Sequence, residues 1–268
     1  MSKIALFAVL LLLIVTTLLT AAPSEDMQTL TDRIAREFSG KTPKEWGENV
    51  TGVRSRLATG EKVLALTLDA CGSAKGKGAD LKLINYLVQE QIPATLFVNA
   101  RWIDANPVLF KRLAANQLFE IANHGMWHKP ASTNGRAVYG IEGTRDVREL
   151  VQEIELNARK IEEITGKRTR FYRSGTAYYD EYAVQVANLL GHEVAGFSLL
   201  GDAGATFSAA QVKTALLSSK PGDIIIAHLN HPEAGTGAGI MAALPELKKR
   251  GFKFVTLSGY PLKQLSTP

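Results

Sequence analysis

Residues 63–69 read Val-Leu-Ala-Leu-Thr-Leu-Asp, a short apolar run that ends in a carboxylate. Four later apolar segments also end at, or just before, a reactive side chain, namely His124, Arg173, Asp202 and His228. Short, continuous apolar strands separated by helices indicate parallel pairing with both faces of the sheet covered. Because the carboxyl ends of parallel strands face one side of such a fold, we expect these side chains to converge on one pocket, as in an enzyme.

Strand and helix patterns alternate from residue 62 onward. A helix pattern separates each pair of the expected strands, which lie at 63–68, 94–98, 119–123, 170–173, 193–199, 223–229 and 253–257. Helix-stop signals stand where this alternation requires them, as Lys-Pro-Gly at 220–222 and Arg-Gly at 250–251. Seven or eight such strands favour an α/β barrel, and a doubly wound open sheet is the alternative.

The N-terminal region has the layout of a secretory signal peptide. Lys3 precedes the apolar run 4–19, and Thr20-Ala21-Ala22 supplies the small residues of a cleavage site. We therefore expect a signal peptide over 1–22 and export to the periplasm or the medium, without stable membrane association after cleavage. An uncleaved membrane anchor is the alternative.

After this leader, residues 23–60 are expected to form an N-terminal extension with a short amphipathic helix at 27–38, packed on a single catalytic domain over 61–268.

The composition narrows the class of protein. A length of 268 residues suffices for one large α/β domain, and no basic run is interleaved with aromatic residues, which argues against nucleic-acid binding. Cys71 is the single cysteine, so an internal disulfide is excluded and the core must supply the stability. Cys71 is interpreted as a small buried apolar residue rather than as a soft zinc ligand.

The sequence His124-Gly-Met-Trp-His128 is the strongest candidate for a metal site. Histidine is the commonest neutral metal ligand, and two imidazoles four residues apart can reach one ion from a helix or a tight turn. Gly125 stands where a zinc-protease helix has glutamate, so that motif does not match. Gly125 indicates a corner between a strand and a loop instead.

The other four side chains have chemistry that suits hydrolysis. Asp69, at the end of an apolar strand, is expected to act as a base or a metal ligand whose charge is stabilised by Arg173 or by an ion. Arg173 emerges from an apolar segment and so needs an acidic partner. His228 is placed to donate a proton to a leaving group. Asp202 could hold the imidazole of His228 in one tautomer, and the alternative is an aspartate that only shapes a turn. His192 is assigned no role.

The order Thr67-Leu68-Asp69, His124-x-x-x-His128, Phe171-Tyr172-Arg173 and Ile226-Ala227-His228 resembles the polysaccharide deacetylase family, carbohydrate esterase family 4. The resemblance extends roughly over 62–257. It implies a distorted (β/α)₇ barrel, a divalent metal that is often zinc, and an acetylated polysaccharide as substrate.

The resemblance also implies a role for each candidate residue. Asp69 corresponds to the catalytic base, His124 and His128 to metal ligands, Arg173 to the residue that orients the base, and His228 to the general acid.

The chain departs from the family pattern after Asp69. The family has a second aspartate there that binds the metal, whereas this chain has Ala70. Asp69 itself, Cys71 through a local bulge, or water could fill the position. The expected function is metal-dependent removal of acetyl groups, most readily N-deacetylation of a peptidoglycan- or chitin-like glycan. The alternatives are a catalytically impaired glycan-binding homologue and an amidase that acts on a small linear amide.

Overall fold

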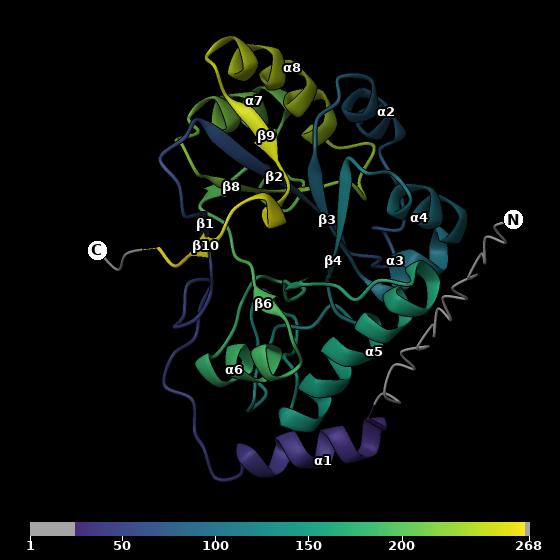
Figure 1. Ribbon diagram of the computed structural model, residues 1–268, viewed down its shortest axis with the longest axis vertical. Coiled ribbons are helices and arrows are strands. Elements are labelled where there is room, and N and C mark those ends of the chain that lie inside the picture. The colour runs from purple at the N-terminus through teal and green to yellow at the C-terminus, as the bar shows by residue number, and fades with distance from the viewer. Residues whose placement is uncertain (1–24, 266–268) are drawn as a thin grey trace, which may run out of the picture.

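A computed structural model describes residues 25–265 of the chain (Figure 1). The expected signal peptide over 1–22 lies outside these residues. Within the described range, no helix has the length and apolar character needed to cross a bilayer.

Parallel strands form one curved sheet at the centre of the fold. The strand order is β6-β5-β4-β3-β2-β8-β7, and β9 pairs with β2 beside β8. The bounds are β2 (Val63–Ala70), β3 (Ala94–Val98), β4 (Phe119–Asn123), β5 (Phe171–Tyr172), β6 (Glu193–Val194), β7 (Leu199–Leu200), β8 (Ile224–His228) and β9 (Lys253–Val255). Because β6 and β7 stand at the two ends of this order, the barrel is open between them. The expected distorted α/β barrel is confirmed.

Helices cover the outer face of this sheet (Figure 1). Their bounds are α2 (Leu81–Gln89), α3 (Ala100–Ala105), α4 (Pro107–Ala114), α5 (Val147–Thr165), α6 (Glu181–Leu189), α7 (Ala209–Leu217) and α8 (Thr236–Lys249). The sequence pattern predicts all of them except α3, which begins at the Asn99 cap. Asn99 accepts a hydrogen bond from the backbone N–H of Arg101, as capping residues do.

The strand β2 shows how the sequence distributes side chains between the two faces. Leu64, Leu66, Leu68 and Ala70 belong to the hydrophobic cluster that includes the buried sides of α2 and α8. Ala65 belongs to a separate cluster with side chains of β3, β4 and β5, inside the barrel. Since side chains alternate along a strand, the residues 67, 69 and 71 follow Ala65 toward the interior.

The single strand expected over 193–199 is wrong, because the structure divides it into β6 and β7. The carbonyl groups of Ala195 and Gly196 accept hydrogen bonds from the guanidinium of Arg173 instead of a neighbouring strand. Arg54 forms an isolated parallel bridge with Ala195. A buried cation and the N-terminal segment therefore take the place of the missing strand pairing.

The N-terminal extension packs on the side of the barrel. The expected helix is confirmed as α1 (Met27–Glu37), which lies against α5 (Figure 1). Leu30, Ile34 and Phe38 are buried in a cluster with apolar residues of α5 and α6. The chain then reaches β1 (Arg56–Leu57), which pairs antiparallel with β10 (Leu262–Lys263) near the C-terminus, after the short 3₁₀ helix η1 (Leu257–Gly259).

Candidate active site

The carboxyl ends of β2, β4, β5 and β8 bring the predicted residues together. Asp69 on β2 lies directly beside His228 on β8 in the parallel register. Oδ1 of Asp69 accepts a hydrogen bond from Nη1 of Arg173 at 2.8 Å, and both side chains are buried. The acidic partner that the sequence predicts for Arg173 is thus Asp69.

The guanidinium of Arg173 is fully enclosed. It donates hydrogen bonds to the hydroxyl of Thr67 at 2.8 Å, to the carbonyl of Ala195 at 3.1 Å and to the carbonyl of Gly196 at 2.8 Å. Its central carbon lies 4.1 Å from the ring centre of Phe97. The fork of donors on arginine allows this arrangement, which holds one oxygen of the Asp69 carboxylate in a fixed position.

His124 follows β4 with its ring orientation fixed. Nδ1 lies 2.9 Å from the backbone oxygen of Arg173, so Nδ1 carries a proton and donates it, and Nε2 is the ring atom that faces the site. This Nε2 atom lies 3.7 Å from Sγ of Cys71 and 3.8 Å from Oδ2 of Asp69. The side chain amide of Asn99 donates to the carbonyl oxygens of His124 and Gly125, which holds the corner after the strand.

The turn from His124 to His128 requires unusual backbone conformations. Gly125 has φ of 77° and His128 has φ of 64°, both in the left-handed region. The buried carboxylate of Glu153, on α5, accepts hydrogen bonds from the backbone N–H groups of Trp127 at 2.8 Å and Lys129 at 3.0 Å. As a result the two imidazole rings lie 4.9 Å apart and perpendicular to each other.

Glu153 is a site residue that the sequence analysis misses. Burial raises its pKa to about 7, although the hydrogen bonds from Lys129 and Trp127 act in the opposite direction. A β-carbon on Gly125 would lie only 2.2 Å from Oε1 of Glu153, so the carboxylate needs glycine at that position. On the sequence alone, Glu153 is one of many charged residues on a long helix.

Cys71 joins the two histidines. The donor atoms of Cys71, His124 and His128 all lie within 4.8 Å of one another, the one such group that includes these histidines in residues 25–265. Of the third ligands that the sequence leaves open, which are Asp69, Cys71 and water, the structure gathers Cys71 with the imidazoles, and Oδ2 of Asp69 lies 3.8 Å from Nε2 of His124. The apolar role favoured for Cys71 does not fit this arrangement. The physical reason is the alternation of β2, which turns Asp69 and Cys71 to the interior and Ala70 toward the helices.

The surroundings of Cys71 favour the thiolate. Burial raises the pKa of the thiol, but the charge of His128 and hydrogen bonds with His124 and His228 outweigh this effect and lower the pKa well below its ordinary value. A thiolate is the form of cysteine that binds metals.

This donor set fits a divalent metal. Nε2 of His128 is buried and has no hydrogen-bond partner among the described residues, which is costly for a polar atom unless another ligand occupies the position. One thiolate and two imidazoles would supply three nitrogen and sulfur ligands, the number that catalytic zinc sites take from the protein.

His228 and Asp202 form the second polar pair of the site. Nδ1 of His228 lies 2.9 Å from Oδ1 of Asp202, and the backbone N–H of His228 donates to Oδ2 at 2.8 Å. Thr236 donates a further hydrogen bond to Asp202. Burial lowers the pKa of His228, but hydrogen bonds with Asp202 and Cys71 outweigh it and raise the pKa well above the ordinary value. The geometry therefore fits the orienting role expected for Asp202.

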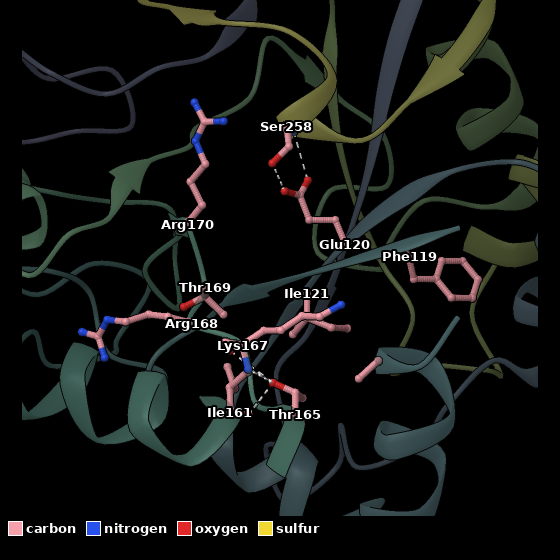
Figure 2. Close-up of a pocket in the computed structure, with 11 residues that line it drawn as sticks. Phe119, Glu120, Ile121, Ile161, Thr165, Lys167, Arg168, Thr169, Arg170 and Ser258 are labelled. Carbon is pink, nitrogen blue, oxygen red and sulfur yellow. Dashed lines mark hydrogen bonds between the residues drawn. The ribbon is translucent and has the colours of Figure 1, made fainter. Parts of the chain in front are cut away.

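A cavity of about 300 Å³ lies at the other end of the strands (Figure 2). It is lined by Phe119 at the start of β4 and by Arg170, which precedes β5. Figure 2 shows Glu120 turned toward Ser258 at its rim, and the backbone N–H of Ser258 donates to Oε2 of Glu120 at 3.2 Å. None of the candidate catalytic residues lines this cavity, so it is separate from the site described above.

The comparisons with known proteins concern the family and the fold. Residues 56–195 match the family model described as polysaccharide deacetylase. A curated relative, the peptidoglycan-N-acetylglucosamine deacetylase of Bacillus cereus, is 26% identical over 202 residues, which is 74% of this chain and 87% of the relative.

Solved structures with the same fold include enzymes and a pseudoenzyme. A family 4 carbohydrate esterase from Bacillus subtilis superposes with a TM-score of 0.64 at 18% identity, over 82% of this chain and 96% of that one. A family 4 pseudoenzyme from Bacillus anthracis gives a TM-score of 0.63 at 18% identity, over 77% and 67%. The family model matches more than half of the chain, and donor atoms that could hold a metal ion stand at the ends of its strands. This chain therefore belongs to the polysaccharide deacetylase family.

Proposed function

We propose that the protein is a metal-dependent hydrolase that removes acetyl groups from an extracytoplasmic polysaccharide, with N-deacetylation of a peptidoglycan- or chitin-like glycan as its main reaction. Family membership supports an acetylated polysaccharide as the substrate class. The curated relative acts on peptidoglycan N-acetylglucosamine, according to its name, which favours an N-acetyl group over an O-acetyl group. The signal-peptide pattern at 1–22 supports export.

One observation carries this proposal. A Cys71-His124-His128 donor group, a buried Asp69-Arg173 pair and a His228-Asp202 pair meet at the same ends of the parallel strands. Binding alone needs neither a held carboxylate base nor an imidazole with a raised pKa. The three groups together supply the parts that hydrolysis of an amide requires.

Each residue has a separate task in the proposed reaction. Asp69, held by Arg173, removes a proton from the attacking water. His228 donates a proton to the departing sugar nitrogen, and Asp202 keeps Nδ1 of that ring engaged so that Nε2 presents the proton. One water is consumed, the carbon–nitrogen bond breaks, and the products are acetate and a free amine.

Cys71, His124 and His128 would hold the metal, and we propose Zn²⁺ because a thiolate and two imidazoles suit it. When bound, the metal supplies the activation of water and the polarisation of the acetyl carbonyl. The carboxylate of Glu153 holds the backbone between the two histidines.

A catalytically impaired glycan-binding protein is the second candidate. The superposition on a family 4 pseudoenzyme and the alanine at position 70 favour it. The complete Asp69-Arg173 and His228-Asp202 pairs favour the enzyme.

Acetate release separates the two candidates. The purified protein should release acetate from peptidoglycan, chitooligosaccharides or acetylated xylan, and a chelator should abolish the release. His124→Ala should lose both metal and activity, whereas His192→Gln, a change at a buried histidine just before the start of β6, should keep both. Activity that survives in His124→Ala contradicts the metal assignment, and wild-type protein that binds glycan without any release of acetate supports the second candidate.

A further inference from the structure

A group of aromatic side chains lies on the surface beside the candidate active site. Trp46 from the N-terminal extension, Tyr139 from the segment after β4 and Tyr178 from the segment after β5 come from three separate parts of the chain. The ring centres of Trp46 and Tyr178 lie 5.8 Å apart, and those of Tyr139 and Tyr178 lie 5.5 Å apart. We refer to these three residues as the aromatic platform.

The backbone connects the platform to the metal donors. The carbonyl of Tyr178 accepts hydrogen bonds from the backbone N–H of Ala131 at 3.0 Å and from the hydroxyl of Ser174, next to Arg173, at 2.9 Å. Ala131 is three residues from His128, a span of at most about 11 Å. The platform therefore lies within the reach of a polymer whose reacting sugar occupies the site.

Tyr139 has a backbone conformation that its side chain disfavours. Val138 and Ile141 exchange backbone hydrogen bonds across a two-residue turn, in which Tyr139 has φ of 54° and Gly140 has φ of 73°. Such turns favour asparagine followed by glycine, because both central residues need positive φ. Tyrosine is strained there, and its side chain is 70% exposed. Burial in a core does not account for an aromatic ring at this position.

Polar groups border the platform. The guanidinium of Arg136 lies over the ring of Trp46, 5.2 Å from its centre. Glu48 is half-buried, and burial raises the pKa of its carboxyl group. The pKa of Tyr139 is raised to about 12, and the largest cause is a hydrogen bond with the Tyr178 side chain. The charge of Glu48 makes a smaller contribution in the same direction.

This combination matches the chemistry of a sugar ring. A pyranose has a face of C–H groups that packs on an aromatic ring, and a rim of hydroxyl groups that hydrogen-bond to carboxylates and guanidinium groups. We propose that the aromatic platform, with Glu48 and Arg136 at its edge, is a glycan-binding subsite that holds a pyranose one or more units away from the sugar that loses its acetyl group. This inference rests on the proposed function, because it takes a glycan polymer as the substrate.

The turn geometry provides a sharp test. Tyr139→Asn removes the ring and installs the residue that this turn favours, so the thermal stability should stay the same or increase. Tyr139→Phe keeps the ring and serves as the matched control. With a series of chitooligosaccharides of increasing length, Tyr139→Asn should raise KM for the longer members by about 3- to 10-fold, as expected for loss of one stacked ring. Its kcat, and its activity on single N-acetylglucosamine, should not change, and Tyr139→Phe should behave as wild type.

A second measurement is independent of catalysis. The wild-type protein, Tyr139→Asn and Tyr139→Phe are sedimented with insoluble chitin and with insoluble peptidoglycan, with and without chelator. Wild type and Tyr139→Phe should co-sediment, and Tyr139→Asn should remain in solution to a larger extent. If Tyr139→Asn binds and converts long glycans as wild type does, the subsite is rejected while the deacetylase function stands. If wild type binds glycan through Tyr139 but releases no acetate, the subsite stands and the proposed reaction fails.

Discussion

Replacement of Arg173 with methionine tests the buried ion pair on which the site is built. Methionine fills much of the volume of the side chain but leaves the carboxylate of Asp69, which is 2% exposed, without its cation. The carbonyl groups of Ala195 and Gly196 also lose their donors. Removal of one partner of a buried pair costs about 3–5 kcal/mol, because the remaining charge stays in a region without water.

For a chain of this length that cost corresponds to a decrease in Tm of about 6–20 °C. Urea denaturation of metal-free protein measures it as a loss in the free energy of unfolding. Asp69→Asn in the Arg173→Met background removes the unpaired charge and should restore part of the loss, so the two changes should not be additive. A loss below about 1 kcal/mol in Arg173→Met, which is typical of surface changes, would refute this reasoning. So would a double variant that is no more stable than Arg173→Met.

Three further outcomes are expected at other positions. Burial, together with the charge of Arg168, lowers the pKa of His192 from 6.5 to about 4. Because the unfolded chain then binds a proton more readily, the free energy of unfolding should fall by about 3 kcal/mol as the pH decreases from about 6.5 to about 4. Urea denaturation at a series of pH values measures this decrease, and His192→Gln should lose it. Glu153→Gln replaces one acceptor oxygen with a donor that faces a backbone N–H, so it should lower the free energy of unfolding by about 1–3 kcal/mol and weaken metal binding. Denaturation and metal titration measure the two effects, and equal values for both proteins would contradict the role of Glu153. Asp202→Asn removes the carboxylate that orients His228, so kcat for acetate release should fall by about 100-fold with little change in metal content, and an unchanged kcat would argue against His228 as the acid.

The fold follows from the sequence where hydrophobic runs are local and regular. The strands at 94–98 and 119–123 have the bounds that the pattern predicts, and the reactive side chains stand at the strand ends as expected. The break between β6 and β7 is different, because it depends on Arg173, which lies elsewhere in the sequence. The guanidinium of Arg173 donates hydrogen bonds to the carbonyl groups of Ala195 and Gly196. A local pattern holds no information on such a partner.

The same distinction applies to the site. The position of Cys71 could have been predicted, since a period of two from Asp69 along β2 places both side chains inside the barrel. Glu153 could not have been identified in this way. Its function depends on how the turn before Lys129 folds onto α5, and the hydrophobic period of α5 indicates only which residues are buried. The buried carboxylate of Glu153 is explained by the hydrogen bonds that it accepts from backbone N–H groups of this turn.

The most direct test of the account is the absorption spectrum of the protein loaded with Co²⁺. Since Cys71 is the only cysteine, a thiolate-to-cobalt charge-transfer band can arise only from this residue. We predict one equivalent of bound metal and such a band in wild type, loss of the band in Cys71→Ser, and loss of bound metal in His128→Ala. Bound Co²⁺ without a charge-transfer band, or no bound metal at all, would contradict a Cys71-His124-His128 metal centre.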